Sequence, residues 1–199
     1  CGDLAYGFAH FRCESCNASR LVAFSCGGRG VCPSCAGRRM TERAADLVDR
    51  VLPHVRHRQW VLSLPFWLRW RLAWDHDLAK AVLRVFIRVV FGFYRKRARR
   101  AGLAGGRTGS VTVVQRFGGA LNLNVHFHTL VPDGVWVEGP QEKLTFHPVR
   151  PPTPDDLERL VGLVETRVRR LVVARGLWHD DEDGGAPAPP DELPGLADL

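Results

Sequence analysis

Apolar positions in the first half of the chain follow spacings that predict one helix, one strand and one long helix. Over residues 38–57 they recur at helical spacing, and Pro53 falls near the end of that pattern. Residues 59–64 have the pattern of a strand, which Pro65 stops. Residues 75–101 predict a long helix that Asp75 or Asp77 can cap and that Gly102 follows.

The second half predicts two hairpins and a final helix. Strands over 110–117 and 121–131 are joined by a tight turn at Gly118-Gly119, and a second hairpin over 134–146 turns near Gly139-Pro140. A helix then begins at Thr153 and stops at Gly176. Its buried stripe is predicted to contain Leu157, Leu160, Val161, Val164, Val168, Leu171 and Val172.

These elements predict an α+β fold in three segments. Residues 1–57 form a small cysteine-rich module with little apolar surface in its first 37 residues. Residues 58–178 form an antiparallel sheet with helices packed on one face. Residues 179–199 are acidic and rich in Pro and Gly, which predicts a linker or a disordered tail.

Charge is distributed unevenly along the chain. Residues 1–120 carry 21 Lys and Arg against 7 Asp and Glu, whereas residues 121–199 carry 7 against 14. A basic front half favours a polyanionic partner such as DNA, although a solvated basic surface is the alternative. No apolar run is long enough to span a membrane and no signal peptide is evident, so we expect a cytoplasmic protein. Because the sequence begins at Cys1 rather than Met, we expect a fragment.

All six cysteines lie in the first 35 residues, where their spacing predicts zinc. Cys13-x2-Cys16 and Cys32-x2-Cys35 form two pairs separated by 15 residues, and four soft ligands so spaced suit a tetrahedral structural ion. Disulfides or a redox pair are the alternatives. The remaining Cys1 and Cys26 are candidates for a second zinc site, to which His10 could contribute, or are ordinary thiols. The number of zinc ions therefore stays open.

Residues 121–128 alternate strictly between apolar and polar side chains. On a strand, Asn122, Asn124, His126 and His128 share one face while the apolar residues face the core. Imidazoles from neighbouring positions on one face can hold a divalent ion, which can neutralise and align a phosphate. The alternative is two structural histidines hydrogen-bonded on a sheet.

The third ligand of such an ion is not evident from the sequence, although Gln115 is a polar residue in an apolar strand. A two-residue turn at Gly118-Gly119 pairs Gln115 with Asn122 and Val111 with His126. That register places Gln115 roughly 13 Å from His126 along the strand, which favours a hydrogen-bonding role in the core, while Gln115 is kept as a candidate metal ligand.

Two motifs, in this order, resemble a known family. The residues Cys13-x2-Cys16, Ser25-Cys26, Arg29-Gly30-Val31-Cys32-Pro33-Ser34-Cys35 and Arg38-Arg39-Met40 resemble a transposase zinc-binding domain. Gln115-Arg116-Phe117-Gly118, the run from Leu121 to His128 and Asp133-Gly134-Val135 resemble the His-hydrophobic-His (HUH) region of rolling-circle insertion-sequence transposases with two catalytic tyrosines.

The resemblance implies an HUH endonuclease-like fold and a strand-nicking reaction. A tyrosine hydroxyl attacks single-stranded DNA at transposon ends, which gives a 5′-phosphotyrosine link and a free 3′-hydroxyl. His126 and His128 then hold catalytic Mg²⁺ or Mn²⁺, and the cysteines hold structural Zn²⁺. Tyr6 and Tyr94 do not match the family's tyrosine pair, so we expect the nucleophile beyond residue 199.

Other readings of the same motifs are a non-catalytic zinc-dependent DNA-binding protein or truncated remnant, and a rolling-circle replication initiator. The oligomeric state is open. In each reading the residues expected to contact DNA are Arg12, Arg20, Arg29, Arg38, Arg39, Arg95, Arg97, Arg99, Arg100, Asn122 and Asn124.

Overall fold

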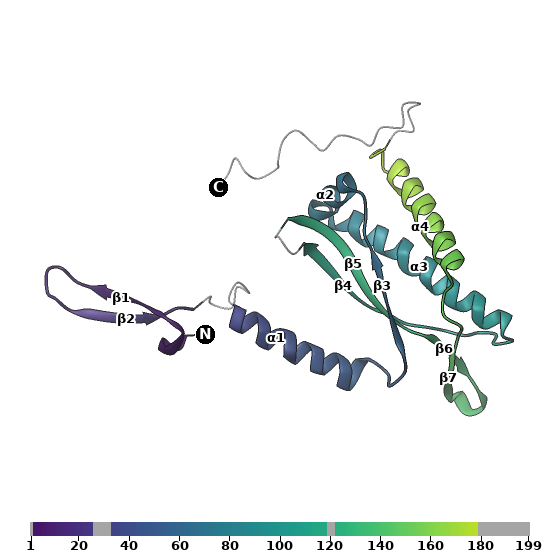
Figure 1. The fold of residues 1–199 in the computed structure, drawn as a ribbon, viewed down its shortest axis with the longest axis horizontal. Helices are drawn as coiled ribbons and strands as arrows, with labels where there is room; N and C mark the ends of the chain where they lie inside the picture. Colours follow the sequence, from purple (N-terminus) through teal and green to yellow (C-terminus); the bar gives the residue numbers. More distant parts are fainter. Residues whose placement is uncertain (1, 26–32, 119–121, 179–199) are drawn as a thin grey trace. The chain divides into compact units, whose positions relative to one another are not determined.

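A computed structural model describes residues 2–25, 33–118 and 122–178, without the side chains of Tyr6 and of residues 33–36. The chain divides into two compact units, Cys1–His54 and Val55–Leu199 (Figure 1). The acidic segment 179–199 lies outside the described residues. No helix in the described part of the chain is long and apolar enough to cross a bilayer.

The first unit contains a β-hairpin and a helix. A short 3-10 turn η1 (Leu4–Tyr6) precedes the antiparallel strands β1 (Phe8–Arg12) and β2 (Ser19–Ala23), which the sequence pattern did not predict. Helix α1 (Pro33–Asp46) continues as a π-helical turn η2 (Leu47–Val51). The helix was predicted over 38–57, so the prediction placed both its start and its end several residues too late. Leu52 is extended because it precedes Pro53, and the residue before a proline disfavours helix.

The second unit is an α+β arrangement around a three-stranded antiparallel sheet. Its strands β3 (His57–Leu62), β4 (Val111–Phe117) and β5 (Leu123–Pro132) lie in the order β3-β5-β4. A separate hairpin consists of β6 (Gly134–Glu138) and β7 (Leu144–Pro148), with a short turn η3 (Pro140–Glu142) between them. The hairpin predicted near Gly139-Pro140 is confirmed.

Three helices complete this unit. Helix α2 (Phe66–Trp74) follows β3 and was not predicted. Helix α3 (His76–Arg100) is capped by Asp75, whose carboxylate accepts from Asp77 N at 3.0 Å and Leu78 N at 2.8 Å. Helix α4 (Pro154–Ala174) starts in a capping box made by Thr153 and Asp156. The predicted caps of the two long helices are thus confirmed.

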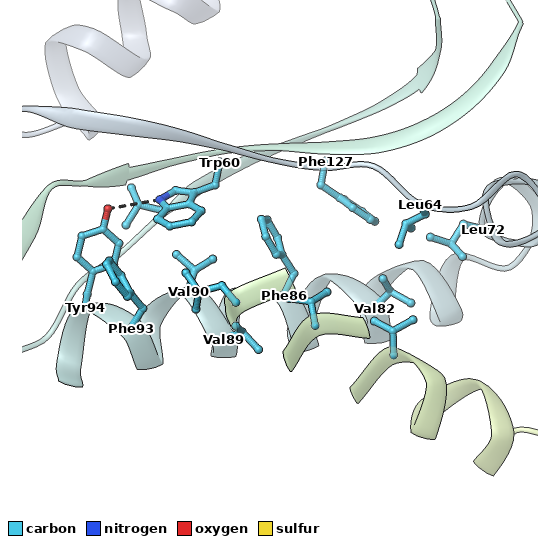
Figure 2. Packing of buried hydrophobic residues seen from close by; sticks show 14 of the residues in the cluster. Trp60, Leu64, Leu72, Val82, Phe86, Val89, Val90, Phe93, Tyr94 and Phe127 are labelled. Carbon is cyan, nitrogen blue, oxygen red and sulfur yellow. Dashed lines mark hydrogen bonds between the residues drawn. The ribbon is translucent and has the colours of Figure 1, made fainter. Parts of the chain in front are cut away.

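The core lies between the sheet and α3, with α4 packed beside α3 on the same side of the sheet (Figure 1). Figure 2 shows Trp60 of β3 and Phe127 of β5 directed at the stripe of α3 that contains Phe86, Val90 and Tyr94. Burial of such large apolar side chains provides the main driving force for folding. The prediction of helices on one face agrees with this packing.

The buried stripe of α4 differs from the predicted one. Leu157 and Val161 are 44% and 66% exposed, whereas Leu160, Val164 and Val168 are buried. Leu157 and Val161 instead line a cleft of about 390 Å³ that α4 forms with β3 and α2. The prediction assigned too wide a stripe, because the helix contacts its neighbours along one narrow line.

Candidate metal centre

Strand β5 presents two imidazoles on one face of the sheet. Val125, Phe127 and Val131 point into the core, so His126 and His128 project from the opposite face. Their ring centroids are 4.8 Å apart, with the planes inclined at 64°. Metal–imidazole bonds are about 2.1 Å long, so two rings this close can share one ion.

Each imidazole is held through its Nδ1 atom. His126 Nδ1 lies 2.6 Å from the carbonyl oxygen of Asn124, so Nδ1–H donates and Nε2 keeps its lone pair. His128 Nδ1 lies 2.6 Å from the carboxamide nitrogen of Gln59 on β3, which donates to it. If that carboxamide is turned over, its oxygen accepts from Nδ1–H and the Nε2 of His128 keeps its lone pair, as in His126. Metal-ligating histidines in proteins are oriented by such contacts.

The Nε2 atom of His128 is buried and, among the described residues and their contacts, has no hydrogen-bond partner. His126 itself is only 9% exposed. An unsatisfied polar atom in a buried place is costly, and a divalent ion would satisfy it. The donor chemistry of the two rings therefore fits the metal that the resemblance implies.

Gln115 lies directly across from His126, which corrects the predicted register. Phe117 pairs with Leu123 and Gly118 N donates to Asn122 O, so the two strands pair three residues later along β5 than a two-residue turn would give. A β-bulge between Gln115 and Phe117 adds one further residue. Together these shift the partner of Gln115 from Asn122 to His126, so the predicted separation of roughly 13 Å was wrong.

The side chain of Gln115 is exposed on the histidine face and not buried in the core as predicted. Its Nε2 donates to the carbonyl oxygen of Phe117 at 3.0 Å, which leaves its Oε1 for another contact. Within the described residues, no cluster of three His, Cys, Asp or Glu side chains could hold a metal. The Gln115 carboxamide, across from His126, offers an additional oxygen donor on this face.

Basic residues approach the same end of β5 from α2 and β4. Arg69 of α2 donates from Nη1 to Asn124 Oδ1 at 2.9 Å, and Arg116 donates from Nη2 to His76 Nε2 at 2.7 Å. Asn122 is exposed beside Gly118. The sequence reasoning missed Gln59 and Arg69, because α2 and the β3–β5 register were not predicted.

Tyr94 faces away from this centre. Its hydroxyl donates to Asp133 Oδ1 at 3.1 Å and accepts from Trp60 Nε1 at 3.3 Å, and its side chain is fully buried. Arg58 pairs with the same carboxylate at 2.8 Å. Burial raises the pKa of Tyr94 to about 12, and this hydroxyl is a poor nucleophile in the folded protein.

The first cysteine pair lies at the tip of the β1–β2 hairpin. Cys13 N donates to Ala18 O at 2.8 Å and Asn17 N donates to Cys13 O at 2.9 Å, which folds the pair into a tight turn. Both thiols are exposed. The Ser15 hydroxyl, 3.0 Å from Cys13 Sγ, is the main cause that lowers the pKa of this thiol to about 6. Its thiolate form is the one that binds zinc.

The other predicted zinc ligands cannot be placed. Cys1, Cys26 and Cys32 lie outside the described residues, as does the side chain of Cys35, whose backbone is in the first turn of α1.

The arginines expected to contact DNA have different surroundings. Arg12 bonds to Asn17 at 2.5 Å, Arg20 is exposed and Arg38 pairs with Glu42 at 2.9 Å, while Arg29 lies outside the described residues. Arg39 also has a partner. At the end of α3, Arg95, Arg99 and Arg100 are exposed. Arg97 instead pairs with Asp156 and covers the ring of Phe93 at 4.9 Å.

Comparison with known families gives two matches. The family described as "Transposase zinc-binding domain", of the IS91 type, matches residues 1–64. The family described as "Putative transposase", of the Y2 type, matches residues 109–184, which include β4, β5 and both histidines. No curated protein and no solved structure was found to match the sequence.

Proposed function

Because the chain belongs to the IS91-type transposases and carries a zinc-binding domain, we propose that it acts on single-stranded DNA at transposon ends. In this proposal the first unit holds structural zinc through Cys13, Cys16, Cys32 and Cys35. The histidine face of the sheet holds Mg²⁺ or Mn²⁺ beside the phosphate to be cut. The reaction is nicking and joining through a tyrosine.

The pair of oriented imidazoles is the observation that carries this proposal. Asn124 and Gln59 hold the two Nδ1 atoms, and with the Gln59 carboxamide oxygen turned toward His128 both Nε2 atoms are available on the same face. The nearby Gln115 carboxamide is the proposed third ligand, because it is opposite His126 and its oxygen is uncommitted to Phe117. Two imidazoles and a carboxamide leave room for water and a phosphate oxygen around one ion.

A divalent ion in this place would neutralise charge on the phosphate and align it for attack. Basic side chains of the same unit would position the DNA strand at this ion. The Arg69–Asn124 contact fixes one end of the face, and Arg116 adds positive charge at the neighbouring strand. The guanidinium groups of Arg69 and Arg116 are suited to hold DNA phosphates in place.

The attacking group in the proposed reaction is a tyrosine hydroxyl. Its oxygen gives up its proton and forms a bond to phosphorus, the bond from phosphorus to the 3′ oxygen breaks, and that oxygen takes up a proton and leaves as a hydroxyl. Tyr94 is unsuited to this step because it is buried on the other face of the sheet and hydrogen-bonded to Asp133. The proposal assigns Tyr94 to the core only.

A non-catalytic zinc-dependent DNA-binding protein is the second candidate. In that case His126 and His128 would be structural, and the chain would bind DNA without any need for a divalent ion. The position of His128 beside His126, with ring centroids 4.8 Å apart and an unpartnered Nε2, favours the metal site. An unpartnered Nε2 alone does not, because among the described residues His57 has one too.

Manganese binding to the zinc-loaded protein tests the metal site directly. We expect electron paramagnetic resonance to detect one bound Mn²⁺, and expect binding to be lost in His126→Ala and in His128→Ala. Gln59→Ala should weaken it by about 10–100-fold, as observed for residues that orient metal ligands. His54→Ala is the matched control, because His54 is exposed and outside the sheet.

Nicking is then measured on a single-stranded oligonucleotide with the product of the complete gene. Strand cleavage should require Mn²⁺ or Mg²⁺ and should be absent in His126→Ala. Wild-type manganese affinity in a His126→Ala/His128→Ala double variant, or cleavage by that variant, would refute the metal site and favour the binding protein.

A further inference from the structure

A basic groove runs between α3 and α4. It encloses about 260 Å³, and a single acidic residue, Asp156, lines it. Its six cationic residues come from both helices: Arg88, Lys96, Arg97 and Arg100 from α3, and Arg159 and Arg167 from α4. Asp156 already bonds to Arg97 and Arg159. In the described part of the chain, no carboxylate pairs with the other four, so their charge is available to a ligand.

The groove is long enough to follow a nucleic-acid strand. From Arg88 to Arg100 the α3 wall extends about 18 Å, at about 1.5 Å per helical residue. Phosphates of one strand of duplex DNA recur about every 3.4 Å along the axis, so this wall spans about five of them. Arginine and lysine in such a row are the usual partners of a phosphate backbone.

Gly92 lies on the floor of the groove, between the turns of α3 that carry Arg88 and Lys96. A β-carbon built there would meet nothing within 4 Å, so packing gives no reason for a glycine. Glycine inside a helix weakens it relative to alanine. A missing side chain on a concave basic surface instead lets a ligand approach the helix backbone closely.

The groove offers no platform for unstacked bases. Its one aromatic residue, Phe93, is 9% exposed and is covered by the guanidinium of Arg97. Proteins that bind single strands combine positive charge with exposed aromatic rings, whereas phosphate contacts alone suit duplex DNA. The ligand chemistry indicated is therefore a duplex phosphate backbone.

We propose that this groove is a second DNA-binding surface. It binds double-stranded DNA adjacent to the single-stranded segment that binds at the histidines. Helix α3 packs on the Phe127 side of the sheet, so the groove and the two imidazoles are separated by the sheet (Figure 2). The inference rests on the proposed function in taking DNA as the ligand, but no residue of the histidine face takes part.

The test compares two double variants that remove the same charge. Lys96→Gln/Arg167→Gln neutralises the groove, and Lys143→Gln/Arg150→Gln neutralises exposed cations elsewhere in the same unit. Fluorescence anisotropy of the zinc-loaded chain, without added divalent ions, gives the affinity for a labelled duplex and for the matching single strand over a range of NaCl concentrations.

We expect the groove variant to bind the duplex about ten-fold more weakly, while the affinity of the control variant changes little. The slope of log K against log NaCl concentration should become smaller in magnitude by about 2 in the groove variant. Gly92→Gln, which fills the floor and removes no charge, should also weaken duplex binding. All these variants should keep wild-type manganese binding, so failure here and failure of the metal site are distinguishable.

Equal losses in the groove and control variants would overturn the proposal. A loss as large for the single strand as for the duplex would overturn the assignment to duplex DNA. Circular dichroism melts establish that the variants are folded, which the exposure of Lys96 and Arg167 leads us to expect.

Discussion

Tyr94 illustrates how much a single side chain does in this fold. Its hydroxyl connects the indole of Trp60 to the carboxylate of Asp133, which Arg58 neutralises. Three elements, β3, α3 and the turn after β5, are thereby joined through one buried polar network. Such a network specifies a unique packing only while each member keeps its partner.

Replacement of Tyr94 by phenylalanine should lower the free energy of unfolding by about 2 kcal/mol at neutral pH, because two buried hydrogen bonds, to Asp133 and from Trp60, are lost. The pKa of Tyr94 is raised from 10.0 to about 12, so its stabilisation is complete below pH 10 and is lost as the pH rises through about 12. Urea melts across this range should therefore show a steeper alkaline loss in the wild type than in Tyr94→Phe. Parallel curves would contradict the assignment.

At the scale of elements, the start of α4 depends on Thr153. Its hydroxyl accepts from Asp156 N at 3.3 Å, and the Asp156 carboxylate accepts from Thr153 N at 3.0 Å. The backbone N–H of Thr153 is the main cause that lowers the pKa of Asp156. Asp156 also accepts from Arg97 of α3, so the cap and the α3–α4 contact share one carboxylate.

Thr153→Ala should cost about 1 kcal/mol of stability, because an N-cap oxygen is removed. Thr166→Ala is the matched control within the same helix. The Thr166 hydroxyl donates to Gly162 O and caps nothing, and alanine has the higher helix propensity. Thermal melts should thus show a lower midpoint for the first variant only. A similar shift in both would indicate that the cap contributes nothing specific.

Elements with strong local signals could be predicted from the sequence, whereas others depend on distant contacts. The starts of α3 and α4 are indicated by their capping residues, Asp75 and Thr153. The β6–β7 hairpin is likewise indicated by the turn residues between its strands. Helix α2 is apolar apart from Arg69 and Arg71, because Leu68 and Leu72 are buried while its tryptophans pack on each other and on Trp178.

The candidate metal site was predictable in part for the same reason. The shared face of His126 and His128 follows from strand alternation alone. The position of Gln115 depends on a β-bulge and on the pairing of Phe117 with Leu123, and Gln59 comes from a strand far away in the sequence. Register between strands is set by such tertiary details and not by local pattern.

At the scale of the whole molecule, the two units differ in what stabilises them. The apolar residues of β1 and β2, including Phe8, Phe11 and Leu21, are exposed, and an isolated two-stranded hairpin is marginally stable. The buried apolar core of the described chain begins at Trp60 and lies within the second unit. We therefore expect zinc to supply folding free energy to the first unit only.

Removal of zinc should unfold the first unit and spare the second. All six tryptophans lie between residues 60 and 178, so their fluorescence reports the second unit alone. A chelator should release zinc and reduce the circular dichroism signal, while the tryptophan melting midpoint stays within a few degrees of its starting value. A large fall in that midpoint would show that the second unit also depends on the metal.

Strand β5 is the middle strand of its sheet, and both of its faces are in use: one packs the interior and the other presents the imidazoles. The alternation has a period of two residues, so gaining or losing a single codon within this strand would send the histidines inward and the valines outward. Reading-frame-preserving insertions and deletions are therefore more damaging here than a conservative replacement of one apolar core residue. We therefore expect related genes to differ in β5 by substitutions and to keep its length unchanged.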